Sequence, residues 1–326
     1  MRVFDYIKDK KQKLAEKIID KPVPDGLGIR VSLEELIMEQ RRSVKLFKND
    51  SLKLSTSGAG SYRSIFKGRG MEFDEVRVYQ QGDDIRMIDW RVTARKGEAF
   101  TKLYQEEREK PVFILADLRP RMRFATRGEY KTVIAARTAA LLAWSAYSRG
   151  DKVGGTVLSC RKGIDFPPRK DRKKIFAFLN ALSQATYENN DYTKNTLSEA
   201  LMRVRRVSKS GGMIFVISDF NDFNDEAKRH FSDVSLKNEV FFINIIDPIE
   251  ESLPPGTYQV SNGFDYMTLP ADDKNFMAAY IDYFRSKREA LKRYCDTKRI
   301  KVVTLHTNDD VADTLRKEIM RSAGRR

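Results

Sequence analysis

Cysteine and histidine are scarce in this sequence of 326 residues, which contains two of each. Cys160 and Cys295 provide no disulfide framework, and we expect both to be free thiols buried in the fold. His230 and His306 lie far apart in the sequence, which argues against a zinc site and against most histidine-based catalysis. A phosphate-binding loop of the form G-x-x-x-x-G-K-S/T is also missing, so the sequence does not predict a P-loop ATPase.

Long apolar runs are missing as well. The longest runs have the length of a strand, such as VFFINII at 240–246, whereas a membrane-spanning helix needs about 20 apolar residues. The first residues, MRVFDYIKDKKQKLAEK, lack the apolar core of a signal peptide. We therefore expect a cytoplasmic protein without a transmembrane segment. A basic amphipathic helix expected at 4–21 either docks on the protein or makes peripheral membrane contact, and the sequence leaves this open.

The charge of the chain is strongly positive, with a net charge of +15. Such a balance permits sequence-independent binding to nucleic acids or anionic membranes. However, the basic residues are mixed with 46 acidic residues, and only RKDRKK at 169–174 and the tail RSAGRR form basic clusters. This distribution favours a generic basic surface over a dedicated nucleic-acid site.

From Pro111 onward, apolar runs typical of strands alternate with helical segments. The runs are VFILA (112–116), VGGTVLS (153–159), MIFVIS (213–218), VFFINII (240–246) and IKVVTLH (300–306). Helices are expected at 129–149, 170–187, 196–209, 225–236, 272–298 and 309–322. Because the runs are apolar throughout, helices should cover both faces of the sheet. This pattern predicts an α/β domain at 111–326 with a doubly wound, mainly parallel sheet.

The residues before Pro111 show a different sequence pattern. Ser32 and Glu35 form a capping-box pattern that predicts a helix over 33–48, within a helical N-terminal arm at 1–49. A β-rich element at 50–110 follows, which we expect to fold into short strands and tight turns with many paired charges. Since only EEREKP joins this element to the first strand of the α/β domain, we expect it to pack on that domain.

The segment at 57–95 combines charges of both signs, glycines and large aromatic residues, without a recognisable catalytic constellation. Its run FKGRGMEFDEVRVYQQGDDIRMIDWRVTAR resembles the DUF58 family. Members of that family are bacterial proteins with a von Willebrand factor A-like domain, usually encoded beside a MoxR-type AAA+ ATPase. We call the matching residues the signature element; they include Phe66, Lys67, Gly68, Arg69, Gly70, Glu72, Phe73, Arg77, Tyr79, Gly82, Asp83, Arg86, Asp89, Trp90 and Arg95.

The resemblance implies a degenerate metal-ion-dependent adhesion site at the strand ends. Asp117 and Asp219 match its two aspartates, but Arg119 and Arg121 replace both serines of its D-x-S-x-S motif. The position of its threonine falls in YTKNTLSEAL, where Thr193, Asn195 and Thr196 are all candidates and the best register puts Asn195 there. A guanidinium has no lone pair and repels a cation, so we expect no magnesium and no other cofactor. One arginine should instead neutralise Asp117 and Asp219, either as a structural ion pair or as a contact for an acidic group of a partner.

The resemblance further implies a non-enzymatic adaptor. Such a protein works with a MoxR-type AAA+ ATPase in the chaperone-like maturation or assembly of an unknown protein client. The strand-end face would contact the partner or client, and the signature element would form or support a second surface. Two alternatives come from other classes: a basic nucleic-acid-binding protein, and, with less support because of the arginines, a metal-dependent hydrolase that uses Asp117 and Asp219.

Overall fold

The computed structural model describes residues 28–46, 71–106, 111–161, 163–188, 196–207, 211–261 and 266–324. The helix expected at 4–21 lies outside these residues. So do Asn195 and the first five residues of the signature element, at 66–70.

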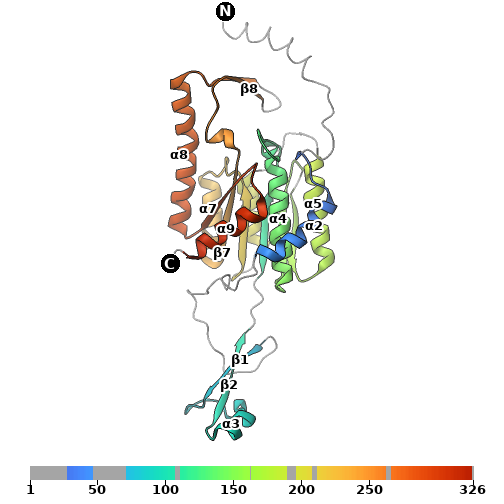
Figure 1. Cartoon of the computed structure of the whole chain (residues 1–326), viewed down its shortest axis with the longest axis vertical. Coiled ribbons are helices and arrows are strands. Elements are labelled where there is room, and N and C mark those ends of the chain that lie inside the picture. Colours follow the sequence, from blue (N-terminus) through green and yellow to red (C-terminus); the bar gives the residue numbers. More distant parts are fainter. Residues whose placement is uncertain are drawn as a thin grey trace, which may run out of the picture.

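A six-stranded sheet forms the centre of the molecule, in the order β10-β7-β6-β3-β4-β5 (Figure 1). Its strands are β3 (Val112–Asp117), β4 (Val153–Leu158), β5 (Ile164–Arg169), β6 (Met213–Ser218), β7 (Glu239–Ile246) and β10 (Lys301–His306). All neighbours pair in parallel except β5, which runs antiparallel to β4. The prediction of a mainly parallel sheet is confirmed, and each of the five expected apolar runs forms a strand.

Strand β5 was not expected from the sequence. Its residues IDFPPR include Pro167 and Pro168 and are only partly buried. Proline cannot donate a hydrogen bond to a strand ladder and is therefore confined to sheet edges and bulges. Both conditions hold here, because β5 lies at the edge of the sheet and its register with β4 shifts between Val153 and Gly155.

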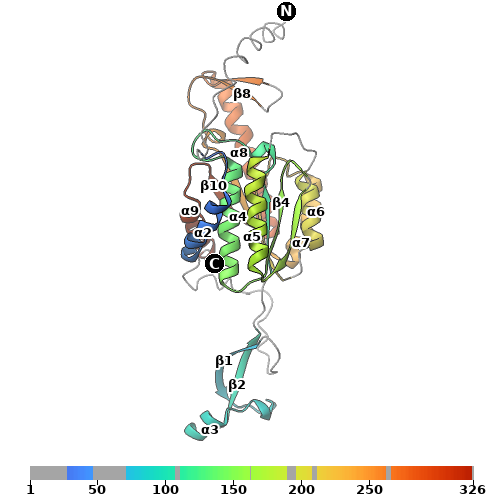
Figure 2. The same cartoon turned by 90° about the vertical axis from the view of Figure 1, so that its right-hand side faces the viewer.

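Helices cover both faces of the sheet, as the apolar strands predicted (Figures 1 and 2). One face packs against α2 (Leu33–Leu46), α4 (Lys131–Ser148), α5 (Arg172–Tyr187) and α9 (Val311–Gly324). The other packs against α6 (Leu197–Val207), α7 (Asp225–Lys237) and the end of α8 (Lys274–Lys298). Alternation along β3 explains the two cores, since Val112 and Ile114 enter the first whereas Phe113 and Leu115 enter the second.

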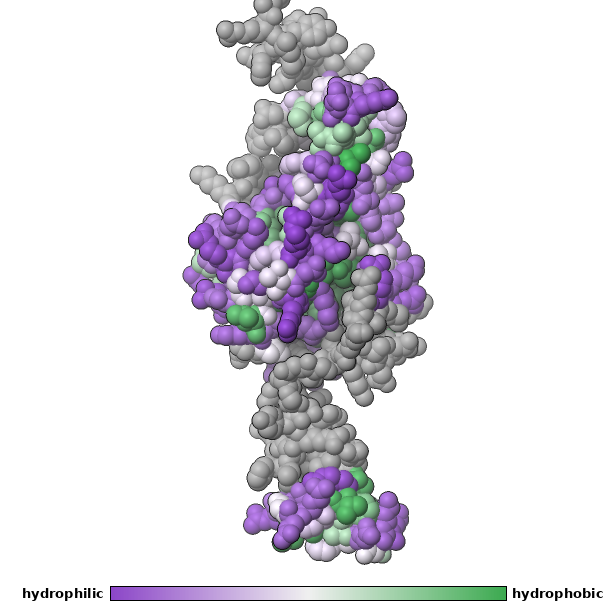
Figure 3. Space-filling model, turned by 90° about the vertical axis from the view of Figure 1, so that its left-hand side faces the viewer, coloured by the Kyte–Doolittle hydropathy of each residue, from purple (hydrophilic) through white to green (hydrophobic). Residues whose placement is uncertain are grey.

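Helix α8 is mostly exposed over its 25 residues, and only Cys295 near its end is fully buried. Its first turns pack against a hairpin of β8 (Thr257–Ser261) and β9 (Tyr266–Pro270), where Leu269 meets Phe276 and Tyr280. Figure 3 shows this face of the molecule as mainly hydrophilic, with apolar side chains gathered where the hairpin meets the helix. No helix among the described residues is both long and apolar enough to cross a membrane.

Neither Cys160 nor Cys295 forms a disulfide bond, as expected. Burial raises the pKa of the Cys295 thiol to about 12, so this thiol stays protonated at neutral pH. Cys160 is only partly buried, and its Sγ lies 2.7 Å from Oε2 of Glu188.

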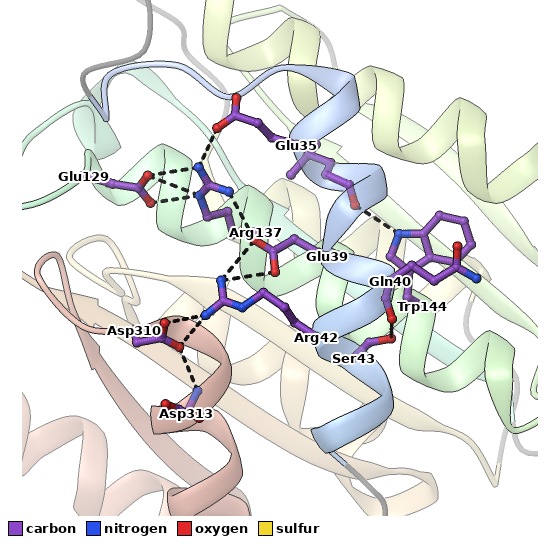
Figure 4. Close-up of polar contacts among 11 residues, drawn as sticks. Glu35, Glu39, Gln40, Arg42, Ser43, Glu129, Arg137, Trp144, Asp310 and Asp313 are labelled. Carbon is purple, nitrogen blue, oxygen red and sulfur yellow. Dashed lines mark hydrogen bonds and ion pairs between the residues drawn. The ribbon is translucent and has the colours of Figure 1, made fainter.

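Helix α2 is held firmly on the α/β domain (Figure 4). The capping box predicted from Ser32 and Glu35 is present, with the Ser32 N–H donating to Glu35 (2.8 Å) and the Glu35 N–H donating to the Ser32 hydroxyl (3.2 Å). The indole N–H of buried Trp144 in α4 donates to the carbonyl of Leu36 at 3.0 Å. Arg137 of α4 forms ion pairs with three glutamates, two of which lie on α2. The described part of the N-terminal arm is therefore part of the domain's packing.

The described part of the signature element is a hairpin with two short helices. Strand β1 (Met71–Val78) pairs antiparallel with β2 (Phe100–Glu106), and the connection contains the 3-10 helix η2 (Ile85–Met87) and α3 (Trp90–Lys96). Figures 1 and 2 show it standing apart from the sheet, beyond the end where β3 begins. This differs from the expected packing on the α/β domain. A connection of a few residues permits such a separation from the α/β domain, because one extended residue can span about 3.3 Å.

Candidate functional site

The end of β3 carries a buried aspartate–arginine pair. Asp117 is fully buried and the side chain of Arg119 is 3% exposed. The guanidinium donates through Nε to Oδ1 (2.8 Å) and through Nη2 to Oδ2 (2.6 Å) of the carboxylate. The hydroxyl of Ser218, the last residue of β6, donates to Oδ2 at 2.7 Å. Both oxygens of Asp117 are thus engaged by neighbouring side chains.

A second carboxylate completes this strand-end cluster. Asp222 accepts from Arg119, with 2.5 Å from Nη1 to Oδ2 and 2.9 Å from Nη2 to Oδ1. Arg121 approaches Asp222 from the rim, with Nη1 3.2 Å from Oδ1 and its side chain 42% exposed. The backbone N–H of Leu197, at the start of α6, also donates to Asp222 at 3.2 Å. The cluster therefore joins the ends of β3 and β6 to α6.

This geometry corrects the expectation for Asp219. Arg119 neutralises Asp117 as predicted, but its second carboxylate partner is Asp222. The oxygens of Asp219 instead accept from the backbone N–H (3.1 Å) and the side-chain amide (2.6 Å) of Asn221. The reason lies in Phe220, the first of the two residues between Asp219 and Asp222, because its left-handed backbone (φ 52°) redirects the chain just after β6. No sequence pattern predicts that turn, so the sequence does not identify Asp222 as the second partner of Arg119.

Electrostatics favour the charged forms of Asp222 and Arg119. Burial alone would raise the pKa of Asp222, but hydrogen bonds and the charge of Arg119, together with the charge of Arg121, lower it below its ordinary value of 3.8. Burial likewise opposes the charge of Arg119, but Asp117 and Asp222 outweigh it and raise the pKa of this guanidinium. By formal charge, the two carboxylates and the two guanidiniums of the cluster balance one another.

The arrangement does not fit a magnesium ion at Asp117. Magnesium needs oxygen ligands in near-octahedral geometry. Here the guanidinium of Arg119 contacts both oxygens of Asp117 and has no lone pair to offer a cation. Across the described residues, no group of three or more His, Cys, Asp or Glu side chains is placed to hold a metal ion.

A second acidic group lies at the end of β7. Asp247 is fully buried, and burial alone would raise its pKa. Hydrogen bonds from the hydroxyl and N–H of Thr126, the hydroxyl of Thr307 and the N–H of Ile249 instead lower the pKa. Because the bonds from Thr126 and Thr307 connect the end of β7 to two neighbouring loops, this carboxylate has a structural role at the strand ends.

The signature residues divide into two groups in the described hairpin. Arg77, Tyr79, Gly82 and Asp83 build the turn after β1. In this turn Arg77 pairs with Asp83 at 2.7 Å, and Gly82 has a positive φ of 108°. Asp89 caps α3 by accepting from two backbone N–H groups. By contrast, three members that follow this turn have exposed side chains: Arg86, Trp90 and Arg95.

Comparison with known proteins gives distant relatives. The chain is 26% identical over 196 residues to the uncharacterized proteins Mb1516 of Mycobacterium bovis and Rv1480 of Mycobacterium tuberculosis. These matches cover 60% of this chain, which spans about 61% of the length of each relative.

Two solved structures also match. BatB from Bacteroides thetaiotaomicron shares 15% identity with a TM-score of 0.39, over 66% of this chain and 98% of that chain. An aerotolerance-related membrane protein from Bacteroides fragilis shares 17% identity with a TM-score of 0.41, over 67% of this chain and its own full length.

The family model described as "Protein of unknown function DUF58" matches residues 75–289. This region includes the signature hairpin from Glu75 onward and the strand-end cluster. The chain belongs to the DUF58 family.

Proposed function

We propose that this DUF58 protein is a non-enzymatic adaptor that works in the cytoplasm with a MoxR-type AAA+ ATPase in the chaperone-like maturation or assembly of other proteins. The observation that carries the proposal is the strand-end cluster. Its buried charges are satisfied internally by Arg119, while Arg121 remains accessible at the rim. A charge-balanced, closed cluster is suited to recognition rather than to proton transfer, because no group in it is free to exchange a proton with a substrate.

A von Willebrand factor A-like architecture is part of this proposal. Counted along the α/β domain, the strands lie in the order 3-2-1-4-5-6, and the third strand is antiparallel. That order places the ends of the first and fourth strands, β3 and β6, side by side at the centre of the sheet. Ligand sites of open α/β sheets lie at such a switch in strand order, which supports the strand-end face as the contact for a partner.

In this interpretation Arg119 takes the place of the metal ion of an adhesion site. It links the carboxylates of Asp117 and Asp222, as a cation would, and is fixed by the fold. Arg121, held near Asp222, then offers its exposed guanidinium to an acidic group of a partner or client.

The test is a pull-down with a purified MoxR-type ATPase from the same genome, with and without ATP. The wild-type chain should retain the ATPase in a nucleotide-dependent way, and Arg121→Glu should weaken retention. Arg285→Glu is a matched control, since it reverses the charge of an exposed arginine on α8. Retention of no ATPase in either nucleotide state would contradict the adaptor role.

The metal question has its own experiment. We propose that the strand-end cluster binds no magnesium, and titration calorimetry with magnesium or manganese should give no heat of binding. Micromolar binding that disappears in Asp117→Ala would overturn this part of the proposal.

Nucleic-acid binding is the second candidate, favoured only by the net charge of +15. It predicts binding to any duplex that falls steeply as salt rises, because each neutralised phosphate releases counterions. The adaptor instead predicts binding that depends on the nucleotide state of the ATPase. Measuring duplex binding and ATPase binding at two salt concentrations separates the two candidate functions.

A further inference from the structure

The outer face of α3 in the signature element has no partner in the described part of the chain. Trp90, Arg91, Ala94 and Arg95 are all exposed, and they form one strip because residues i and i+4 are neighbours on a helix. The opposite face packs on β2, where the hydroxyl of Thr93 accepts the Phe100 N–H at 3.0 Å. The strip is therefore the side of the helix turned away from its own hairpin.

Large apolar side chains are unusually exposed on this element. Trp90 is 67% exposed, and Ile85 in the preceding turn of η2 is 64% exposed. Figure 3 shows hydrophobic and hydrophilic side chains mixed on the surface of this part of the molecule. Tryptophan and arginine are the residues that most often dominate protein–protein binding energy. A hairpin that stands apart from the sheet and exposes both is suited to holding a partner.

Within the described hairpin, the aspartates near this surface accept hydrogen bonds from the backbone and do not pair with the neighbouring arginines. Asp84 accepts the N–H of Arg86 (2.9 Å), and Asp89 accepts the N–H groups of Arg91 (3.0 Å) and Val92 (3.2 Å). These carboxylates cap the backbone, and Oδ2 of Asp89 also lies 3.4 Å from Nζ of Lys102. In the described residues, no carboxylate forms an ion pair with the guanidiniums of Arg86, Arg91 or Arg95. The turns hold the acidic side chains, and the arginines are left available to an outside anion.

From these observations we propose that Ile85, Arg86, Trp90, Arg91 and Arg95 form a docking surface for an acidic, amphipathic segment of a protein partner. Trp90 and Ile85 would contact its apolar residues, and the arginines its carboxylates. The surface is less suited to nucleic acid, because a continuous row of phosphates would also meet Asp84 and Asp89 between the arginines. The choice of a protein occupant rests on the proposed adaptor function, but not on which ATPase is the partner.

The experiment uses the chain's own fluorescence. The protein has two tryptophans, and Trp144 is fully buried, so Trp90 is the one that acrylamide quenches readily. The probe is a synthetic helical peptide with leucine on one face and glutamate on the other, added to the full-length chain. Binding should protect Trp90 from acrylamide and shift its emission to shorter wavelength. The same peptide with glutamine in place of glutamate should bind at least about tenfold more weakly, because it offers the arginines no charge.

Variants locate the site. Arg91→Glu with Arg95→Glu should weaken peptide binding by at least about tenfold, since like charges now face the peptide. The matched control is Arg285→Glu with Arg293→Glu, which reverses two exposed charges on α8 and should leave binding within about twofold of wild type. Thermal unfolding of each variant should match wild type, which separates loss of the surface from loss of the fold.

Three results would overturn the proposal: no protection of Trp90 by the peptide, equal losses in both double variants, or tighter binding of a DNA duplex than of the peptide through the same arginines. Failure here is distinguishable from failure of the proposed function. Arg121→Glu should leave peptide binding unchanged while it weakens retention of the ATPase.

Discussion

The strand-end cluster and the outer face of α3 use the same side chain in opposite surroundings. Arg119 is almost fully buried between two carboxylates, whereas Arg91 is exposed beside carboxylates that are occupied elsewhere. The difference is set by the partners of the aspartates. Asp117 receives the guanidinium itself, and Asp89 receives the backbone of α3. Charge density in a sequence therefore does not tell whether an arginine stabilises the fold or faces a partner.

The largest loss of stability is expected when the buried guanidinium of Arg119 is removed. Arg119→Met would remove the guanidinium that Asp117 and Asp222 share. The loss of one side of a buried ionic network costs about 3–5 kcal/mol of unfolding free energy. Urea unfolding followed by circular dichroism measures this loss. Arg121→Met, at the exposed rim, should cost less than about 1 kcal/mol. Equal losses in the two variants would show that Arg119 is not the structural centre of the cluster.

An intermediate loss of stability is expected at Asp247, which is buried like Asp117 but accepts hydrogen bonds from uncharged donors. Thr307→Val removes one of these donors and should cost about 1–3 kcal/mol in the same unfolding measurement. Thr297→Val, on an exposed position of α8, is the control and should cost less than about 0.5 kcal/mol. A neutral effect of Thr307→Val would mean that the carboxylate finds another donor.

Acid should weaken the strand-end cluster through Asp222. Its pKa is lowered in the folded state, so its contribution is present above the ordinary value of 3.8 and is lost as pH falls through the folded value. The stability gap between wild type and Asp222→Asn should therefore shrink by about 1 kcal/mol between pH 6 and the acid limit of folding, by urea unfolding at each pH. A gap that stays constant with pH would contradict an ionised Asp222 in the folded protein.

The smallest effect is expected on the outer face of α3. Trp90→Ala and Arg91→Ala should each change the unfolding free energy by less than about 0.5 kcal/mol, because neither side chain is buried or paired in the described structure. The measurement is again urea unfolding. A loss above about 1 kcal/mol would show that these residues support the hairpin and would weaken their assignment to a docking surface.

Much of the α/β domain could be predicted from the sequence, because its strands are continuous apolar runs and its helices carry recognisable caps. The capping box of Ser32 and Glu35 correctly predicted the start of α2. Each predicted helix from residue 129 onward lies within a few residues of an observed helix. Within the signature element the expected strands and turns are present, but α3 was not foreseen. Its seven residues, WRVTARK, are too short to show a helical period.

The candidate site was only half predictable. Asp117 and Arg119 are close in sequence at a strand end, so their pairing follows from local geometry. Asp222 depends on the left-handed backbone of Phe220, which is uncommon for a bulky residue. That conformation comes with tertiary packing, since the Phe220 ring stacks on Phe242 with centroids 4.5 Å apart. No pattern in the sequence alone encodes a turn that depends on such a contact.

The two prolines of β5 also affect how copies of this protein behave toward one another. Successive residues of a strand point their N–H groups alternately toward the neighbouring strand and away from it. This alternation is broken at Pro167 and Pro168, where the register with β4 shifts, and neither proline offers an N–H on either side of the strand. An unpaired strand edge is a template on which a second chain can add a strand and begin a fibre. At β5 that template is interrupted, so this protein can be concentrated with less risk that its sheet grows from this edge.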